Sequence, residues 1–100
     1  MSSASPLQRV IAQAALLGAD TIQVEYRDGH EEVSVLKGGV GFEIARFPSP
    51  GRHSAALRKE LAQRRKKKTT VTVNGADYEI RARAYELFAE QAYEVRLRRL

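Results

Sequence analysis

The sequence predicts an α+β fold in which two helices pack on one face of an antiparallel sheet, in the order α-β-β-(β)-α-β-β-β. Two stretches, at 6–17 and 54–64, carry apolar residues at helical spacing. Two turn signals, Asp28-Gly29 and Asn74-Gly75, each lie between runs of alternating apolar and polar residues, which is typical of a β-hairpin. A further alternating run follows at 92–98.

The first predicted helix has clear end signals. Ser5 suits the N-cap, Pro6 suits the first helical position, where a missing N–H costs nothing, and Gly18 can end the helix. The apolar stripe is formed by Leu7, Val10, Ile11, Ala14 and Leu17. We interpret the stripe as packing onto the domain's own sheet, with a docking surface for a partner as the alternative.

The first half of the sheet is predicted as a hairpin followed by a short third strand. The hairpin turns at Asp28-Gly29, with His30 in or beside the turn, and its second strand ends at Lys37-Gly38-Gly39. The short strand is expected at 40–44, with Glu43 pointing outward. The inward side chains of the hairpin are predicted to be Ile22, Val24, Tyr26, Val33 and Val35.

A loop and the second helix come next. The loop is predicted at 47–51, because two prolines and a glycine suit no regular element. The helix is expected to begin near Ser54 as its N-cap and to bury Leu57 and Leu61. Because this apolar stripe is thin, the helix should be partly exposed.

The C-terminal stretch, 69–99, is predicted to form three strands with two distinct faces. Its apolar face is formed by Val71, Val73, Tyr78, Ile80, Ala82, Tyr93, Val95 and Leu97. Its charged face is formed by Glu79, Arg81, Arg83, Glu94, Arg96 and Arg98. The glutamates are expected to pair with arginines across neighbouring strands.

The composition indicates one globular domain, residues 1–100, without disulfides or a cysteine zinc site, since the chain has no Cys. The longest apolar run is too short to cross a bilayer and no signal peptide is recognisable, so a cytoplasmic location is expected. The net charge of +5 favours anionic partners such as nucleic acid, a membrane surface, nucleotide phosphates or an acidic protein.

No catalytic constellation is evident. The two histidines, His30 and His53, are not spaced with carboxylates as metal ligands usually are, and no Walker A or other catalytic motif is present. Asp28 and Asp77 fall at turns, where Asp serves local hydrogen bonding. We therefore expect a protein that is not an enzyme and that has no cofactor or metal of its own.

One candidate binding site is a run of five consecutive cations in which the second predicted helix ends. The run consists of Arg64, Arg65, Lys66, Lys67 and Lys68. It suggests a nucleic-acid or anionic-lipid patch. The alternative is a solvated helix C-terminus, where cations complement the helix macrodipole.

The other candidate is the charged sheet face. Arg81 and Arg96 lie on consecutive predicted strands, and a sheet can bring them close together. Guanidinium groups suit bidentate binding of phosphate or carboxylate. The alternative is a solvated face of Arg–Glu pairs, each contributing under about 1 kcal/mol.

Several segments resemble the N-terminal domain, sometimes described as PAS-like, that precedes the motor core in type II secretion and type IV pilus assembly ATPases. Residues 19–25, A-D-T-I-Q-V-E, are similar to the family's A-S-D-I-H-I-E, and 56–62, A-L-R-K-E-L-A, to its R-I-K-x-L-A helix. Residues 79–81, E-I-R, and 95–97, V-R-L, are similar to its D-L-R and its closing M-R-L-L. The segments occur in the family's order along nearly the whole chain.

The resemblance implies an α+β module that packs against an ATPase core in a hexamer, with Arg81 and Arg96 at positions of arginines that help contact nucleotide phosphates. The chain departs from the family at 36–39, L-K-G-G in place of R-x-D-G, at Gln23 in place of histidine, and at 83–87, which lacks a proline. These 100 residues include no motor domain, so ATP is expected as a ligand only if the rest of the protein or a partner supplies one.

Two functions are expected as alternatives. The first is a non-enzymatic assembly or regulatory module whose arginine-lined face meets a partner ATPase domain or nucleotide phosphates. The second is a small basic nucleic-acid-binding domain that uses the run 64–68 together with the sheet face. Neither function requires insertion into a membrane.

Overall fold

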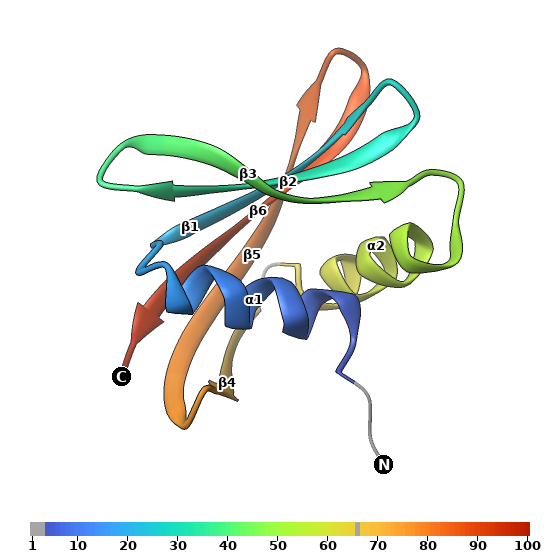
Figure 1. The fold of residues 1–100 in the computed structure, drawn as a ribbon. Coiled ribbons are helices and arrows are strands. Elements are labelled where there is room, and N and C mark those ends of the chain that lie inside the picture. Colours follow the sequence, from blue (N-terminus) through green and yellow to red (C-terminus); the bar gives the residue numbers. More distant parts are fainter. Residues whose placement is uncertain (1–3, 66) are drawn as a thin grey trace.

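A computed structural model describes residues 4–65 and 67–100 and has the predicted α+β architecture (Figure 1). Its elements are α1 (Pro6–Leu16), β1 (Thr21–Arg27), β2 (His30–Lys37), β3 (Val40–Pro48), α2 (Arg52–Arg64), β4 (Lys68–Val73), β5 (Ala76–Leu87) and β6 (Glu90–Arg99). The strands form one sheet in the order β3-β2-β1-β6-β5-β4, with every neighbouring pair antiparallel. The element order is the one predicted, with the optional third strand present.

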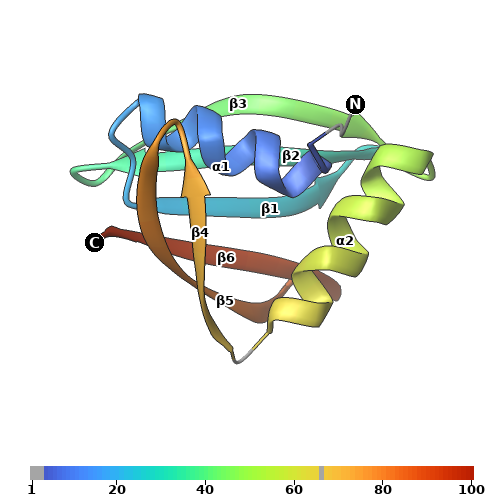
Figure 2. The ribbon, with the colours of Figure 1, turned by 90° about the horizontal axis from the view of Figure 1, so that it is seen from below.

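Both helices cover the same face of the sheet, as predicted, and the core lies between the two layers (Figure 2). The largest buried apolar side chains come from α1, α2 and the strands: Leu7, Ile11, Ile22, Val24, Val33, Val35, Leu57, Leu61, Ile80 and Val95. Each fully buried side chain of this kind contributes about 1.5–3 kcal/mol relative to exposure. We call the opposite, uncovered side of the sheet the outer face.

The predicted start of α1 is confirmed. Ser5 Oγ accepts a hydrogen bond from Gln8 N at 3.1 Å, and Gln8 Oε1 accepts one from Ser5 N at 3.0 Å, which forms a capping box. Pro6 occupies the first turn, and Gly18 follows the helix with a φ of 72°, a conformation that favours glycine.

The sheet curls so that β4, the strand at one of its edges, returns to the helical layer. Figure 2 shows β4 passing close to α1, and Asn74 Nδ2 at the end of β4 donates a hydrogen bond to Ala12 O of α1 at 3.0 Å. The chain leaving α2 is also drawn to the sheet, since Arg65 and Ala82 form an isolated β-bridge. This curvature places the residues after α2 beside β5.

β3 is longer than predicted and includes part of the expected loop. Phe47 and Pro48 belong to the strand, so the loop is reduced to residues 49–51. Pro48 is tolerated because β3 is an edge strand and the proline is its last residue. The prediction of a loop across the whole of 47–51 is therefore wrong.

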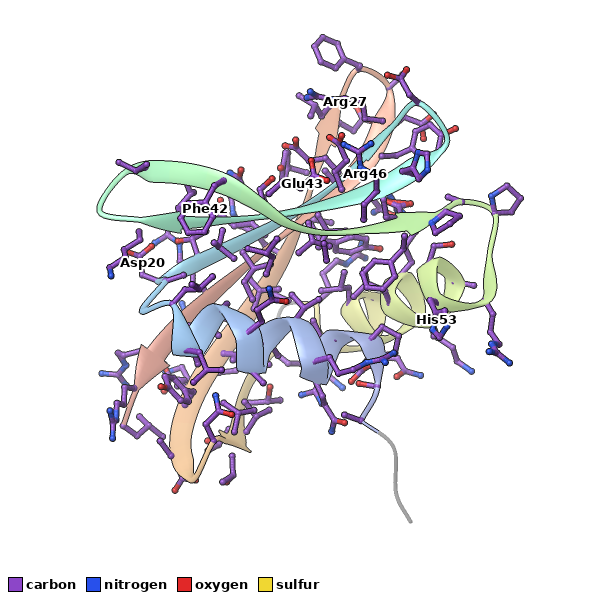
Figure 3. All side chains as sticks on the ribbon, viewed as in Figure 1. Asp20, Arg27, Phe42, Glu43, Arg46 and His53 are labelled. Carbon is purple, nitrogen blue, oxygen red and sulfur yellow. The ribbon has the colours of Figure 1, made fainter. Side chains whose placement is uncertain are left out.

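A β-bulge in β3 decides which of its side chains reach the outer face. The pairing between β2 and β3 shifts by one residue at Ile44. Because of this shift, Glu43 and Arg46, three positions apart, point to the same side of the sheet, away from the helices (Figure 3). Regular alternation would have placed them on opposite faces. The outward prediction for Glu43 is confirmed.

The predicted N-cap of α2 is wrong. α2 begins at Arg52 with Gly51 as its N-cap, and Ser54 lies buried inside the first turn, where its Oγ donates to Gly51 O at 3.0 Å. A Cβ at Gly51 would lie 2.6 Å from Pro48 O, so this tight connection requires glycine. Tyr26 shares the inner face with Val24, since it lies opposite the buried Glu31, but it is exposed because the turn end of β1 extends beyond the core.

A buried ion pair that the sequence did not predict fixes α2 to the sheet. Glu31 is 1 % exposed, and its two oxygens accept from Arg58 Nε at 2.6 Å and Nη2 at 2.9 Å. Arg58 also donates to Gln91 O at 2.7 Å and lies 5.6 Å from the centre of the Tyr93 ring. Burial of a carboxylate is tolerated here because both of its oxygens are paired.

Candidate anion-binding site on the outer face

The strand register brings three of the predicted site residues into one row across the outer face. Lys68 of β4 lies opposite Arg81 of β5, and Arg81 lies opposite Arg96 of β6. Residues directly opposite in an antiparallel sheet have Cβ atoms about 4.5–5.5 Å apart. The structure therefore places Arg81 and Arg96 side by side, with a third cation next to them.

Two shallow hollows adjoin this row. The first has a volume of about 670 Å³ and is lined by Lys67, Lys68, Arg81, Ala82, Arg83, Glu94 and Arg96. The second, of about 510 Å³, extends toward Asp20 and Arg98. Arg81 and Arg96 line both hollows, so a ligand in either one can reach both guanidinium groups. We call Lys67, Lys68, Arg81 and Arg96 the cation cluster.

Glu94 is the carboxylate in the lining of the first hollow, and it is nearly buried. Its oxygens accept from Arg83 Nε at 3.1 Å and Nη2 at 3.3 Å, and from Arg96 Nε at 3.3 Å. The hydrogen bond from Arg83 holds the pKa of Glu94 below its ordinary value, so the carboxylate is charged at neutral pH. Arg83 is thus paired in full, whereas Arg96 shares a carboxylate that is already satisfied.

Arg81 is less compensated than its neighbours in the row, Lys68 and Arg96, each of which has a carboxylate within 4.0 Å. Its side chain is exposed, and within residues 4–65 and 67–100 no carboxylate forms an ion pair with it. Glu79, on the same face of β5, instead pairs with Arg98 at 3.1 Å and lies 4.0 Å from Lys68. Like charges side by side on a sheet are destabilising. The arrangement therefore favours binding of an external anion.

The structure divides the predicted run of five cations. Its last two members belong to the cation cluster, whereas Arg64 turns away, with Nη2 3.7 Å from Glu60. Arg65 is exposed beside β5, and Lys66 lies outside the described residues. Since Arg64 is the basic residue of the last turn of α2 and Lys68 already begins β4, the interpretation of the whole run as a helix end is wrong.

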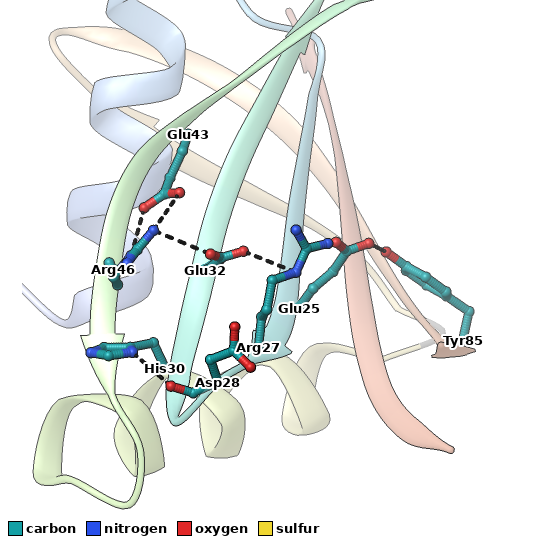
Figure 4. A network of polar contacts seen from close by, with 8 residues as sticks. All are labelled: Glu25, Arg27, Asp28, His30, Glu32, Glu43, Arg46 and Tyr85. Atoms are coloured by element: carbon teal, nitrogen blue, oxygen red, sulfur yellow. Dashed lines mark hydrogen bonds and ion pairs between the residues drawn. The ribbon is translucent and has the colours of Figure 1, made fainter. Parts of the chain in front are cut away.

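The β1–β3 half of the outer face carries a compensated network (Figure 4). Arg46 donates to both oxygens of Glu43, at 2.9 and 3.1 Å, and to Glu32 at 3.2 Å. Arg27 Nε lies 3.5 Å from the other oxygen of Glu32. The hydrogen bond from Arg46 lowers the pKa of Glu43. Each arginine here has a carboxylate partner, in contrast to Arg81.

Groups that could support acid–base chemistry are engaged locally. Tyr85 OH donates to Glu25 at 2.7 Å, and burial, followed by this hydrogen bond, raises the pKa of Tyr85, so the phenol is protonated at neutral pH. His30 Nδ1 lies 3.2 Å from Asp28 O (Figure 4). In the part of the chain that the structure describes, no group of three or more His, Asp or Glu side chains is placed to hold a metal ion.

The predicted pairing of the glutamates on this face is confirmed: Glu79 lies across from Arg98 and Glu94 across from Arg83. The proximity of Lys67 and Lys68 to Arg81 was not predicted. The sequence contains one signal for this proximity. The two-residue Asn74-Gly75 turn fixes the register of β4 on β5, and the short spacing back from this turn places Lys68 opposite Arg81.

The comparisons with known proteins give no family for this chain, because it matches no protein-family model and no curated protein. The resemblance to the secretion ATPase domain therefore stays a prediction. None of the helices among the described residues has both the length and the apolar character needed to cross a membrane.

Proposed function

We propose that this chain is a non-enzymatic binding module whose cation cluster binds a phosphate or carboxylate group presented by a partner. The observation that carries the proposal is the row of Lys68, Arg81 and Arg96 on three neighbouring strands, beside two hollows. Neighbouring like charges repel one another in the unbound protein. An anion held between the guanidinium groups removes this repulsion and accepts charge-assisted hydrogen bonds.

We further propose that the module acts as the N-terminal domain of type II secretion and type IV pilus assembly ATPases does. In this role it is cytoplasmic, and its partner is an ATPase motor domain. The anion is then an acidic side chain of that domain or a phosphate of its nucleotide. ATP is a ligand only together with a motor domain, supplied by the rest of the protein or by a partner. The likeness at 19–25, 56–62 and around the two arginines supports this role.

The arrangement of the arginines adds support that is independent of the resemblance. One phosphate can be shared by two guanidinium groups only if they are neighbours on the same face, as Arg81 and Arg96 are. Arg83 and Arg98 have carboxylate partners at 3.1 Å and are less available. The proposal therefore assigns the anion to Arg81 and Arg96, with Lys67 and Lys68 as additional charges.

The test compares two double variants in titration calorimetry with inorganic triphosphate and with ATP at low salt. Arg81→Ala with Arg96→Ala should weaken binding about tenfold or more, since each charge-assisted hydrogen bond contributes about 1.5–3 kcal/mol. The matched control, Arg27→Ala with Arg46→Ala, removes the same charge from the compensated half and should bind as the wild type does. Equal affinity of the wild type and the first variant would contradict the proposal.

The alternative function is a nucleic-acid-binding domain. It is favoured by the position of Lys67 and Lys68, which extend the cation row from the connection after α2 to β6. A polyanion contacting four cations should show a logarithmic salt slope of about −3, at about −0.7 to −0.9 per neutralised phosphate. Fluorescence anisotropy with a labelled single strand and a labelled duplex measures this slope. Absence of binding to both at low salt excludes this alternative.

A further inference from the structure

The four hairpins of the sheet offer an internal comparison of turn chemistry. Each has a two-residue loop in which both residues have positive φ, the geometry of a type I′ turn. Three loops have the residues that this geometry favours: Asp28-Gly29, Gly38-Gly39 and Asn74-Gly75. The fourth loop, between β5 and β6, is Phe88-Ala89, with φ values of 52° and 64°. Neither residue is suited to this conformation.

The side chain placed on this strained turn is also the most exposed large apolar side chain of the described chain. Phe88 is 89 % exposed, so its own domain does not compensate for the unfavourable backbone conformation. Strained positions that persist in a fold are concentrated at functional sites, and exposed aromatic side chains are frequent anchors of interfaces. The tip of the β5–β6 hairpin therefore has the character of an anchor that a partner covers.

The surroundings of Phe88 indicate the chemistry of that partner. Two exposed carboxylates, Glu86 and Glu90, flank the tip in a chain that is otherwise basic. The complementary surface is an apolar-floored hollow with a cationic rim. The hollow beside the cation cluster has this character, because the apolar stems of its lysines and arginines line it beneath four uncompensated or partly compensated charges. Guanidinium groups also stack on aromatic rings.

The tip cannot reach the hollow of its own molecule. Phe88 follows Arg81 by seven residues along the same hairpin, which at about 3.3 Å per residue places them about 23 Å apart. Contact between tip and hollow must therefore join two molecules. A symmetric contact of two tips is disfavoured, because it would bring Glu86 and Glu90 of both copies together.

We infer that the Phe88 tip of one copy inserts into the cation-lined hollow of a second copy. This inference rests on the proposed function in one respect, since it uses the same cation cluster as a site for an anionic partner. The contact is head-to-tail, so it generates rings or open-ended chains rather than an isologous dimer. In a ring, the second copy supplies what the hollow of the first lacks: two carboxylates and an aromatic ring.

The first test is sedimentation velocity over a range of concentrations at low salt. The wild type should show a sedimentation coefficient that rises with concentration and falls back toward that of the monomer at high salt. Phe88→Asn with Ala89→Gly copies the Asn74-Gly75 turn, so it should raise the midpoint of thermal unfolding and weaken association about tenfold or more, the cost of leaving one aromatic side chain out of an interface. Phe88→Ala, which keeps the turn backbone, should weaken association to a similar degree.

The second test separates this inference from the proposed function. Arg81→Ala with Arg96→Ala should weaken both association and the binding of inorganic triphosphate, and an excess of triphosphate should dissociate wild-type assemblies. A wild type that binds triphosphate but stays monomeric overturns the inference and leaves the proposed function standing. Association that persists in the Phe88 variants, or a monomer that binds phosphatidylcholine vesicles through Phe88, also overturns it. If association requires both the Phe88 tip and the cation cluster but the protein binds no triphosphate, the result supports the inference and contradicts the nucleotide role.

Discussion

The two halves of the outer face are built from the same residue types yet differ in how their charges are compensated. On β1–β3, Arg27 and Arg46 share the carboxylates of Glu32 and Glu43 in one network (Figure 4). Around the two hollows on β4–β6, six described cations line the surface together with three carboxylates, which are Asp20, Glu79 and Glu94. In the β1–β3 half, the arginines and carboxylates compensate one another's charge. The second half leaves charge that an external anion can satisfy.

The difference shows that a basic sheet face indicates an anion-binding site only when the carboxylate partners of its arginines are taken into account. By alternation alone, Arg83 and Arg98 would be equal candidates to Arg81 and Arg96, since all four alternate on the same two strands. Ion pairs at 3.1 Å with Glu94 and Glu79 set the first two apart. Binding capacity therefore depends on which arginines are left over, and the register of the strands decides this.

We expect the outer face to contribute little to stability and the helix-covered face, where the core lies, to contribute most. Arg58→Ala tests this on the helix side, because it leaves the buried carboxylate of Glu31 without a partner. We expect a loss of about 3–5 kcal/mol in the free energy of unfolding, measured by urea denaturation. A loss under about 1 kcal/mol would show that the carboxylate finds water or another partner.

Neutralising Glu94 should sharpen the contrast between the halves. Glu94→Gln keeps the shape of the side chain and releases Arg83 and Arg96 from their shared carboxylate. Removing one charge about 4 Å from a bound anion should favour binding by roughly 1 kcal/mol, or about fivefold in affinity for triphosphate. Glu43→Gln is the matched control in the compensated half. If both variants gain affinity equally, charge surplus alone explains binding and the row geometry does not.

Lowering the pH should weaken the ion pairs of Glu94 as the Glu94→Gln substitution does, because protonation also removes the charge of this carboxylate. The pKa of Glu94 is lower in the folded protein than its ordinary value of 4.5, so the stabilisation from its pairing is fully present above that value and is lost as the pH falls through the lowered pKa. The free energy of unfolding should therefore fall below about pH 4.5 more steeply in the wild type than in Glu94→Gln. Identical pH profiles of the two proteins would argue against the hydrogen bond from Arg83.

The smallest effect is expected in the compensated network. Arg46 is half-exposed, and its partners Glu43 and Glu32 are accessible enough for water to replace it. Arg46→Ala should change the free energy of unfolding by under about 1 kcal/mol, as is usual for surface ion pairs. Chemical denaturation measures this change. A larger loss in the free energy of unfolding would mean that the ion pairs of Arg46 stabilise the bulged edge strand β3.

Local signals predicted the fold well wherever a residue has one dominant conformational preference. Ser5-Pro6 and Gly18 delimit α1, and Asp28-Gly29 and Asn74-Gly75 close their hairpins. The errors arose where tertiary contacts override such preferences. Proline suggests a loop at Pro48, although an edge strand tolerates it, and the Phe88-Ala89 turn has no sequence signal because its residues are poorly suited to the conformation they adopt.

The candidate site could be predicted only in part for the same reason. Alternation places Arg81, Arg83 and Arg96 on one face, since the side-chain period of a strand is fixed at two residues. The inward position of Glu31 also follows from alternation with Val33 and Val35. Its pairing with Arg58 could not be foreseen, because the two residues are 27 positions apart and meet only when α2 packs on the sheet.

The sequence by itself determined the two-faced character of the C-terminal strands, the caps and most of the turns, since these depend on backbone geometry over a few residues. The tertiary structure alone decided that β6 lies between β1 and β5, that Lys68, Arg81 and Arg96 share one row, and that the run of five cations is divided. Strand order and register are set by contacts between distant segments, and side-chain chemistry becomes a site only after those contacts form.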